Sequence, residues 1–196
     1  MTDQGIRTVK KTLLAVAVAG SLSSVCLAFD EAAELEWANE TAKEYQGALK
    51  SELKAAMHAG GTLEAIQICN TKALAIGEEM SLANGESVSR VSLRNRNPGN
   101  VPNDWQEAVL IEFESRKEAG ESPENLTWHE VVETDQGPVF RYMKAIPTAP
   151  LCLQCHGTDI APPVAEKLAE LYPDDMATGF EVGDLRGAFV VTRPVE

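Results

Sequence analysis

Apolar residues recur at three- and four-residue steps in the first third of the chain, which is the spacing of one face of an amphipathic helix. The residues with this spacing are Leu35, Ala38, Ala42, Tyr45, Leu49, Leu53 and Ala56. Gly60-Gly61 should end this helix, because glycine is common just beyond helix C-termini. Thr62 can cap a second helix that runs to about Ala83, where Asn84-Gly85 would close it. The pattern therefore predicts two consecutive helices.

Further along the chain, the period changes to that of strands. The segment SVSRVSLR (87–94) is rich in β-branched and small polar residues and predicts a strand. TWHEVVET (127–134) and PVFRYMKAI (138–146) predict a hairpin joined through Asp135-Gln136-Gly137. LRGAFVVTRP (185–194) predicts a last strand from its β-branched and aromatic content.

Two helices are expected between these strands. Asn103 and Gln106 have the spacing of a capping pair for a helix over residues 104–120, in which Trp105, Val109 and Phe113 share one face. A shorter helix is expected over PPVAEKLAELY. Helices followed by hairpin-linked strands predict the α+β fold class, with an antiparallel sheet and long N-terminal helices.

The N-terminus has the features of a secretory signal peptide. Basic residues lie within 7–11, an apolar stretch covers 13–20, and small residues lead to Ala28. We therefore expect a signal peptide over 1–28 and one mature domain over 29–196. The protein would then be exported, and periplasmic in a Gram-negative source, with no membrane span after cleavage. A retained anchor or a lipoprotein processed at Cys26 are the alternatives.

The chain is acidic, with a formal net charge of −13. This charge argues against nucleic acid and anionic membrane surfaces as partners. It fits a protein that meets a redox partner with a basic docking surface, although an acidic surface kept for solubility would look the same.

The stretch APLCLQCHGTD carries a C-x-x-C-H motif at Cys152, Cys155 and His156. Two thiols at this spacing can be joined to the two vinyl groups of a haem, and the following imidazole can ligate the iron. A zinc site would need a second ligand pair, and the sequence has no other C-x-x-C and no H-x₃₋₅-H. A redox dithiol remains the alternative, but the prolines on both sides of the motif indicate a loop-rich segment rather than a βαβ unit. We expect one covalent haem c.

The cysteine count adds a candidate for the opposite face of the iron. Cleavage after Ala28 would leave Cys69, Cys152 and Cys155, an odd number in an oxidising compartment. Cys69 lies on an apolar stripe with Ile66 and Ala73, so its thiol should point into the core. A buried inert cysteine and a metal ligand both fit this pattern. Other possible ligands are Met57, Met80, Met143, Met176, His58 and His129, each of which also has an ordinary structural explanation.

Four segments occur together in this order: AIQIC (65–69), SRVSLRNRNPGNVPNDWQ (89–106), CLQCHG (152–157) and GFEVGDLRGAFVV (179–191). Over residues 35–193 the chain resembles a family of small exported single-haem c-type cytochromes with a PAS-like fold, often described as a domain of unknown function. The same domain also forms the extracytoplasmic part of sensor kinases.

This resemblance implies a haem with a thiolate on the face opposite the histidine of the C-x-x-C-H motif. The matching positions here are Cys69 and His156. The resemblance also implies that the wall of the haem pocket includes Arg90, Arg96, Asn97 and Asn100, with a haem propionate as the group that Arg96 would contact. The asparagines have an alternative role as turn formers.

A thiolate ligand donates negative charge and favours ferric iron, which lowers the reduction potential. We therefore expect low-potential electron transfer or redox sensing. Reduction should weaken the bond between Cys69 and the iron, so a sensor of a small gas such as NO or CO that works with a separate partner is the second hypothesis. A four-helix cytochrome of the c-prime type is the third, although the hairpin and the terminal strand argue against it.

An enzyme is the less favoured function, because the sequence shows no Ser/His/Asp set, no paired catalytic carboxylates and no distal acid–base pair. The long first helix leaves a homodimer open, since an amphipathic helix packed on its own domain has the same pattern.

Overall fold

The computed structural model describes residue 1, residues 29–82 and residues 86–195. The predicted signal peptide therefore lies, apart from Met1, outside the described residues, and so does the predicted helix stop at Asn84-Gly85. In the described part of the chain, none of the helices is both long enough and apolar enough to cross a membrane.

The elements follow one another as α1 (Glu31–Leu82), β1 (Ser87–Val91), η1 (Pro98–Asn100), α2 (Asp104–Glu118), η2 (Pro123–Asn125), β2 (Thr127–Thr134), β3 (Gly137–Pro147), η3 (Pro150–Cys152), α3 (Leu153–His156), α4 (Pro162–Leu171) and β4 (Leu185–Pro194). The strands form one four-stranded sheet in the order β1-β4-β3-β2, and every pair is antiparallel. The predicted α+β class is confirmed, and the four-helix alternative is wrong.

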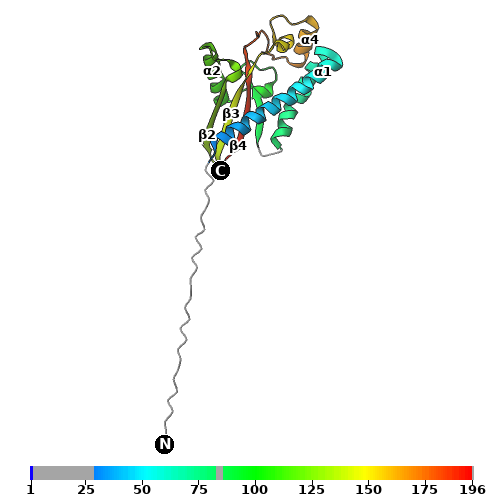
Figure 1. The fold of residues 1–196 in the computed structure, drawn as a ribbon. Helices are drawn as coiled ribbons and strands as arrows, with labels where there is room; N and C mark the ends of the chain where they lie inside the picture. Colours follow the sequence, from blue (N-terminus) through cyan, green and yellow to red (C-terminus); the bar gives the residue numbers. More distant parts are fainter. Residues whose placement is uncertain (2–28, 83–85, 196) are drawn as a thin grey trace.

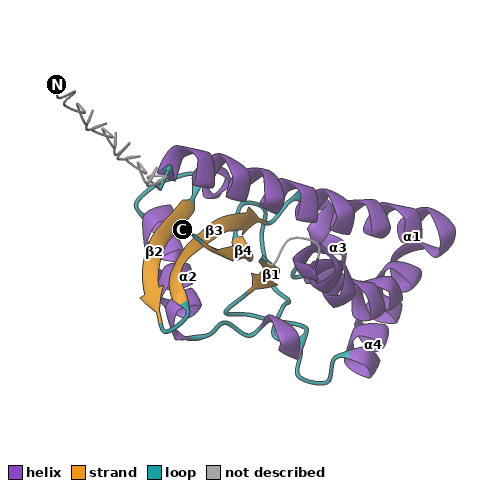
Figure 2. Ribbon diagram, turned by 90° about the horizontal axis from the view of Figure 1, so that it is seen from below, coloured by secondary structure: helices purple, strands orange, loops and turns teal. Residues whose placement is uncertain are grey.

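The sheet has a helix against each face, and the alternation of side chains along β3 and β4 builds one core on each side. On the α1 side, Tyr45 packs with Tyr142 and Phe189. On the α2 side, Phe113 packs with Met143. The first part of α1 runs along the sheet, while α2 lies on the opposite face (Figures 1 and 2). The capping box predicted for Asn103 and Gln106 is present at the start of α2.

The break predicted at Gly60-Gly61 divides α1. Gly61 has φ 70° and ψ −156°, a conformation that L side chains avoid, and Gly60 is also non-helical. The part of α1 after the break has two sets of partners. Near its start, Ile66 contacts a core formed by Val164, Leu168 and Tyr172, and Figure 2 shows α3 and α4 beside this end of α1. Near its end, Ile76 and Met80 pack on the sheet core. The break therefore lets α1 contact both α4 and the sheet.

The first strand is shorter than the sequence predicted. It ends at Val91 rather than at residue 94, because the Ser92 side chain donates a hydrogen bond to the Arg186 carbonyl at 2.8 Å and the Ser92 N–H donates to the Asn100 carbonyl at 3.0 Å. These two bonds turn the chain away from the sheet into the 92–97 loop.

The pairing of β3 with β4 is irregular near the start of β4. Ile146 pairs with Gly187 and Pro147 pairs with Leu185, so Arg186 has no partner on β3. This is a β-bulge, a feature that re-aims a side chain. Gly187 has φ 151°, and a Cβ at this position would lie 2.2 Å from the Val91 carbonyl oxygen. Only glycine fits there.

Gly187→Ala should lower the free energy of unfolding by about 2–4 kcal/mol, because the added methyl group strains the backbone and collides with β1. Gly47→Ala is the matched control, since Gly47 lies within α1 with no atom near its Cβ position, and it should stabilise by about 0.5–1 kcal/mol. Urea unfolding of both variants measures the difference, and equal stability of the two would contradict the role of the bulge.

Candidate functional site

The C-x-x-C-H residues lie in two short helical turns at the end of the molecule away from the chain's C-terminus. Cys152 ends η3, while Cys155 and His156 belong to α3. All three side chains are half-buried. Among the described cysteines, Cys69, Cys152 and Cys155 form no disulfide.

The His156 ring is fixed by the backbone of the 175–180 segment. Its Nδ1 lies 2.7 Å from the Ala177 carbonyl oxygen, and its ring stands edge-on to Phe180 with centroids 6.3 Å apart. A carbonyl oxygen only accepts, so Nδ1 carries the proton and Nε2 keeps a free lone pair. Burial, together with the charges of Arg186 and Arg96, holds the pKa of His156 well below its ordinary value, which favours the neutral ring. This is the orientation and protonation state of a metal-ligating histidine.

Arg96 ties three segments together around the motif. Its Nη2 donates to the carbonyls of Cys155 at 2.6 Å and Ala177 at 3.1 Å, and its Nε pairs with Asp175 at 3.0 Å. Only 10% of the Arg96 side chain and 11% of the Asp175 side chain are exposed. Arg96 therefore lies beside the motif, and these contacts hold residues 175–177 in place next to it. Its predicted contact with a haem propionate stays a prediction.

Cys69 lies on the part of α1 that packs toward α3 and α4. Cys155 packs against the core that contains Ile66, one turn before Cys69, and a hydrogen bond of 3.3 Å joins Thr62 on α1 to Gln154 on α3. Burial raises the pKa of the Cys69 thiol, and the positive charges of Arg90 and Arg96 offset this in part. Burial also raises the pKa of Cys155, and the proximity of Cys69 adds to that rise. The structure thus brings Cys69 to the neighbourhood of the motif.

Two further arginines surround the site. Arg90 is half-buried on β1, and its charge acts on both Cys69 and His156. Arg186, which sequence reasoning missed, lies at the bulge of β4, and its charge is the one that acts most strongly on His156. The sequence contains one indication of Arg186: a basic residue directly precedes Gly187 in a predicted strand whose following residues are apolar.

The two asparagines predicted for the pocket wall shape the loop. The Asn97 side chain caps η1 by accepting from the Gly99 N–H at 2.9 Å. Asn100 is 7% exposed, and its backbone bonds to Asn97 and Ser92. The turn-forming role is therefore observed for both.

The methionines and histidines that the sequence offered as other possible ligands lie in the core, in an ion pair or on the surface. Met143 is fully buried in the core on the α2 side, Met80 packs on the α1 side, and His129 pairs with Glu31 at 2.8 Å. Met176 and His58 are exposed, and Met57 is half-buried on α1. Within the described ranges, no group of three or more His, Cys, Asp or Glu side chains is arranged to hold a metal ion.

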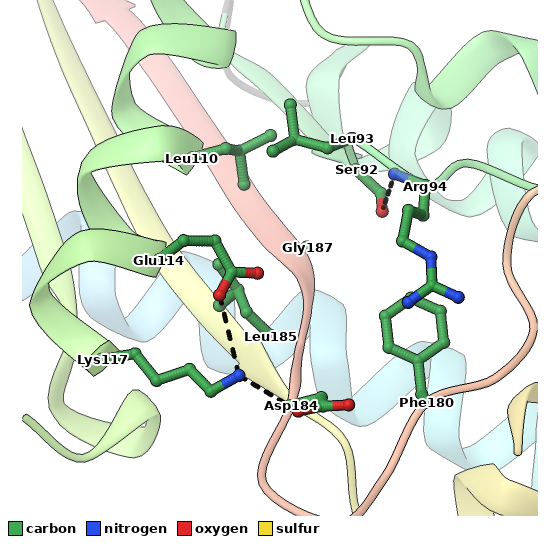
Figure 3. A pocket seen from close by; sticks show the side chains of 10 residues that line it. All are labelled: Ser92, Leu93, Arg94, Leu110, Glu114, Lys117, Phe180, Asp184, Leu185 and Gly187. Carbon is green, nitrogen blue, oxygen red and sulfur yellow. Dashed lines mark hydrogen bonds and ion pairs between the residues drawn. The ribbon is translucent and has the colours of Figure 1, made fainter. Parts of the chain in front are cut away.

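A cavity of about 420 Å³ lies between α2 and the start of β4. In Figure 3 the Arg94 guanidinium lies against the Phe180 ring, 4.0 Å from its centroid, and Lys117 lies between Glu114 and Asp184. A second cavity, of about 730 Å³, is lined by Arg90 and Asn100 among others. Phe180 separates the first cavity from His156, so this ring is a wall shared by the cavity and the motif.

Arg96→Met should lower the free energy of unfolding by about 3–5 kcal/mol, because it leaves the Asp175 carboxylate buried without its cation and frees two carbonyls. Lys43→Met is the matched control: its pair with Glu40 is more than half exposed, so the change should stay within about 0.5 kcal/mol. Thermal and urea unfolding measure the stability of both variants. A loss of stability in Arg96→Met as small as that in Lys43→Met would show that Arg96 does not hold these segments together.

Comparison with known proteins gives a consistent result. The family model described as Tll0287-like, Tll0287, matches residues 21–194. The crystal structure of the cyanobacterial haem protein Tll0287 superposes with a TM-score of 0.63 at 23% sequence identity, covering 85% of this chain and 98% of that chain. Among curated proteins, none matches the chain. The family resemblance expected from the sequence is confirmed, and the chain belongs to the Tll0287-like family.

Proposed function

We propose that this protein is an exported c-type cytochrome that holds one haem through Cys152 and Cys155, with His156 and Cys69 as its axial ligands, and that it works in low-potential electron transfer or redox sensing. The observation that carries the proposal is the fixed His156 ring: its Nδ1 lies 2.7 Å from the Ala177 carbonyl oxygen, and among the described residues its Nε2 has no hydrogen-bond partner. The structural neighbour Tll0287 is itself described as a haem protein.

The residues present fit this group. Two thiols lie in adjacent turns beside the imidazole, and a third, on Cys69, lies near Cys155. Arg90 and Arg186 add positive charge close to the same place, which suits the two propionates of a haem. When bound, a haem supplies a one-electron couple between ferric and ferrous iron.

Cys69 would lower the reduction potential of the haem. Its thiolate places a negative charge in a partly buried position, where an additional electron is costly. The charges of Arg90 and Arg96 moderate this cost, because both favour the thiolate form of Cys69. The thiolate would therefore give the haem a low reduction potential, and the positive charges of Arg90 and Arg96 would limit how far it falls.

Export and partners follow from the sequence. The basic and apolar pattern of residues 7–28 supports secretion to the periplasm, where c-type haem is attached. The net charge of −13 supports a redox partner with a basic docking surface.

The exported, matured protein should carry one covalent haem per chain. In Cys152→Ser/Cys155→Ser, haem should no longer remain on the chain in a denaturing gel, because both thioether positions are lost. Cys69→Ala is the control and should keep the covalent haem. Haem staining and the alkaline pyridine spectrum give the readout. A wild-type chain without covalent haem, made in a host that attaches haem c, would refute the proposal.

Cys69→Ala should change the ferric absorption spectrum and raise the midpoint potential, because a negative ligand is removed. Met80→Leu is the matched control. Met80 is another residue of α1 and packs on the sheet core, and its replacement by leucine nearly conserves the side-chain volume, so the spectrum should stay as in the wild type. An unchanged ferric spectrum in Cys69→Ala would end the thiolate assignment. Binding of CO by the reduced wild type would favour the small-gas sensor over the electron carrier.

A further inference from the structure

Arg186 is aimed by the backbone rather than by a carboxylate. It is the extra residue of the bulge between β3 and β4, so it has no partner across the ladder. Gly187 follows it in a conformation restricted to glycine, and β1 passes so close that no side chain fits there. The bulge thus fixes where the Arg186 side chain begins.

The hydrogen bonds of Arg186 use one side of its guanidinium. Nη1 donates to the Ser92 hydroxyl at 3.0 Å and to the Arg94 carbonyl at 3.2 Å. The bonds of the described residues leave Nε and Nη2 without a protein acceptor. These two N–H groups form the edge of the guanidinium that binds a carboxylate through two parallel hydrogen bonds.

The charge of Arg186 also lacks a counterion among the described residues. Burial, together with the charges of Arg90 and Arg96, lowers its pKa to about 9. Asp175 is close enough to act on Arg186, but this carboxylate is already paired with Arg96 at 3.0 Å. A partly buried cation without an anion is costly, so the fold holds Arg186 ready for one.

The position of Arg186 indicates which anion it meets. Its charge acts on His156 more strongly than any other charge, and Cys152 acts on Arg186 in turn. The geometry agrees: the Arg186 guanidinium lies 5.2 Å from the centroid of the Phe180 ring, and the His156 ring stands edge-on to the same ring at 6.3 Å. A group ligated by His156 would therefore lie near the guanidinium.

Resting on the proposed function, we propose that Arg186 binds one propionate of the haem through Nε and Nη2, while Ser92 and the Arg94 carbonyl hold its Nη1. Arg96, the residue that the sequence favoured for this contact, is instead committed to Asp175 and two carbonyls. Arg186 is a positioning residue whose charge stabilises the reduced state.

The test compares the haem-loaded full chain with Arg186→Gln, Arg186→Lys and Arg141→Gln. Midpoint potentials are measured from weakly acidic to weakly alkaline pH, and the propionate bending bands are recorded by resonance Raman. Arg186→Gln should shift the potential downward and make it pH-dependent, because the propionate that has lost its cation becomes easier to protonate. Arg186→Lys should restore most of the potential, since it keeps the charge, but should still shift the propionate band.

Arg141→Gln is the matched control. Arg141 is also a partly buried arginine over an aromatic ring, with its guanidinium 4.8 Å from the centroid of Trp105, but it pairs with Glu130 on β2 and has no contact with the site. Its loss should leave both readouts as in the wild type. A wild-type potential, pH profile and Raman band in Arg186→Gln, or equal shifts in Arg141→Gln, would overturn the assignment while leaving the cytochrome function intact. A wild-type chain without haem would instead remove both.

Discussion

The contact set of Arg96 holds the site together. One guanidinium joins the 92–97 loop to the turn that carries Cys155 and to the Asp175–Ala177 segment. The last of these segments in turn orients His156, so the ring depends on Arg96 through Ala177. A lysine carries its three N–H donors on one nitrogen, whereas these bonds leave from Nε and Nη2 of a planar guanidinium, so a lysine could not make the same set. Backbone carbonyls accept two of these bonds. The contacts therefore depend on the backbone path of the partner segments more than on their side chains.

The site also concentrates positive charge in a strongly acidic protein. Arg90, Arg96 and Arg186 surround Cys69 and His156, although the chain as a whole is at −13. Most acidic residues lie on the exposed faces, where water screens them, whereas the arginines act from partly buried positions with less screening. The local field at the site therefore has the opposite sign to the field that a partner meets at a distance.

Much of this architecture could be predicted from the sequence, and the exceptions share a cause. The Gly60-Gly61 break, the capping box of α2 and the final strand depend on neighbouring residues, so local patterns were sufficient. The C-x-x-C-H motif is equally local. The early end of β1 and the role of Arg186 depend on which residue of a distant strand lies opposite, and no local pattern contains that register. The contact between Ala177 and His156 could not be predicted either, because Ala177 contributes its backbone carbonyl, a group that every residue has.

The break in α1 has a consequence for the order in which the protein matures. Cys152, Cys155 and His156 occupy adjacent turns, so they are already in register in a chain that has barely folded. Cys69 reaches them only after the part of α1 beyond Gly61 has docked on α4. In the proposed cytochrome, covalent attachment and ligation by Cys69 would thus be separable in time, and the second would report on completed tertiary structure. The absorption spectrum would then distinguish finished molecules from partly folded ones without any added label.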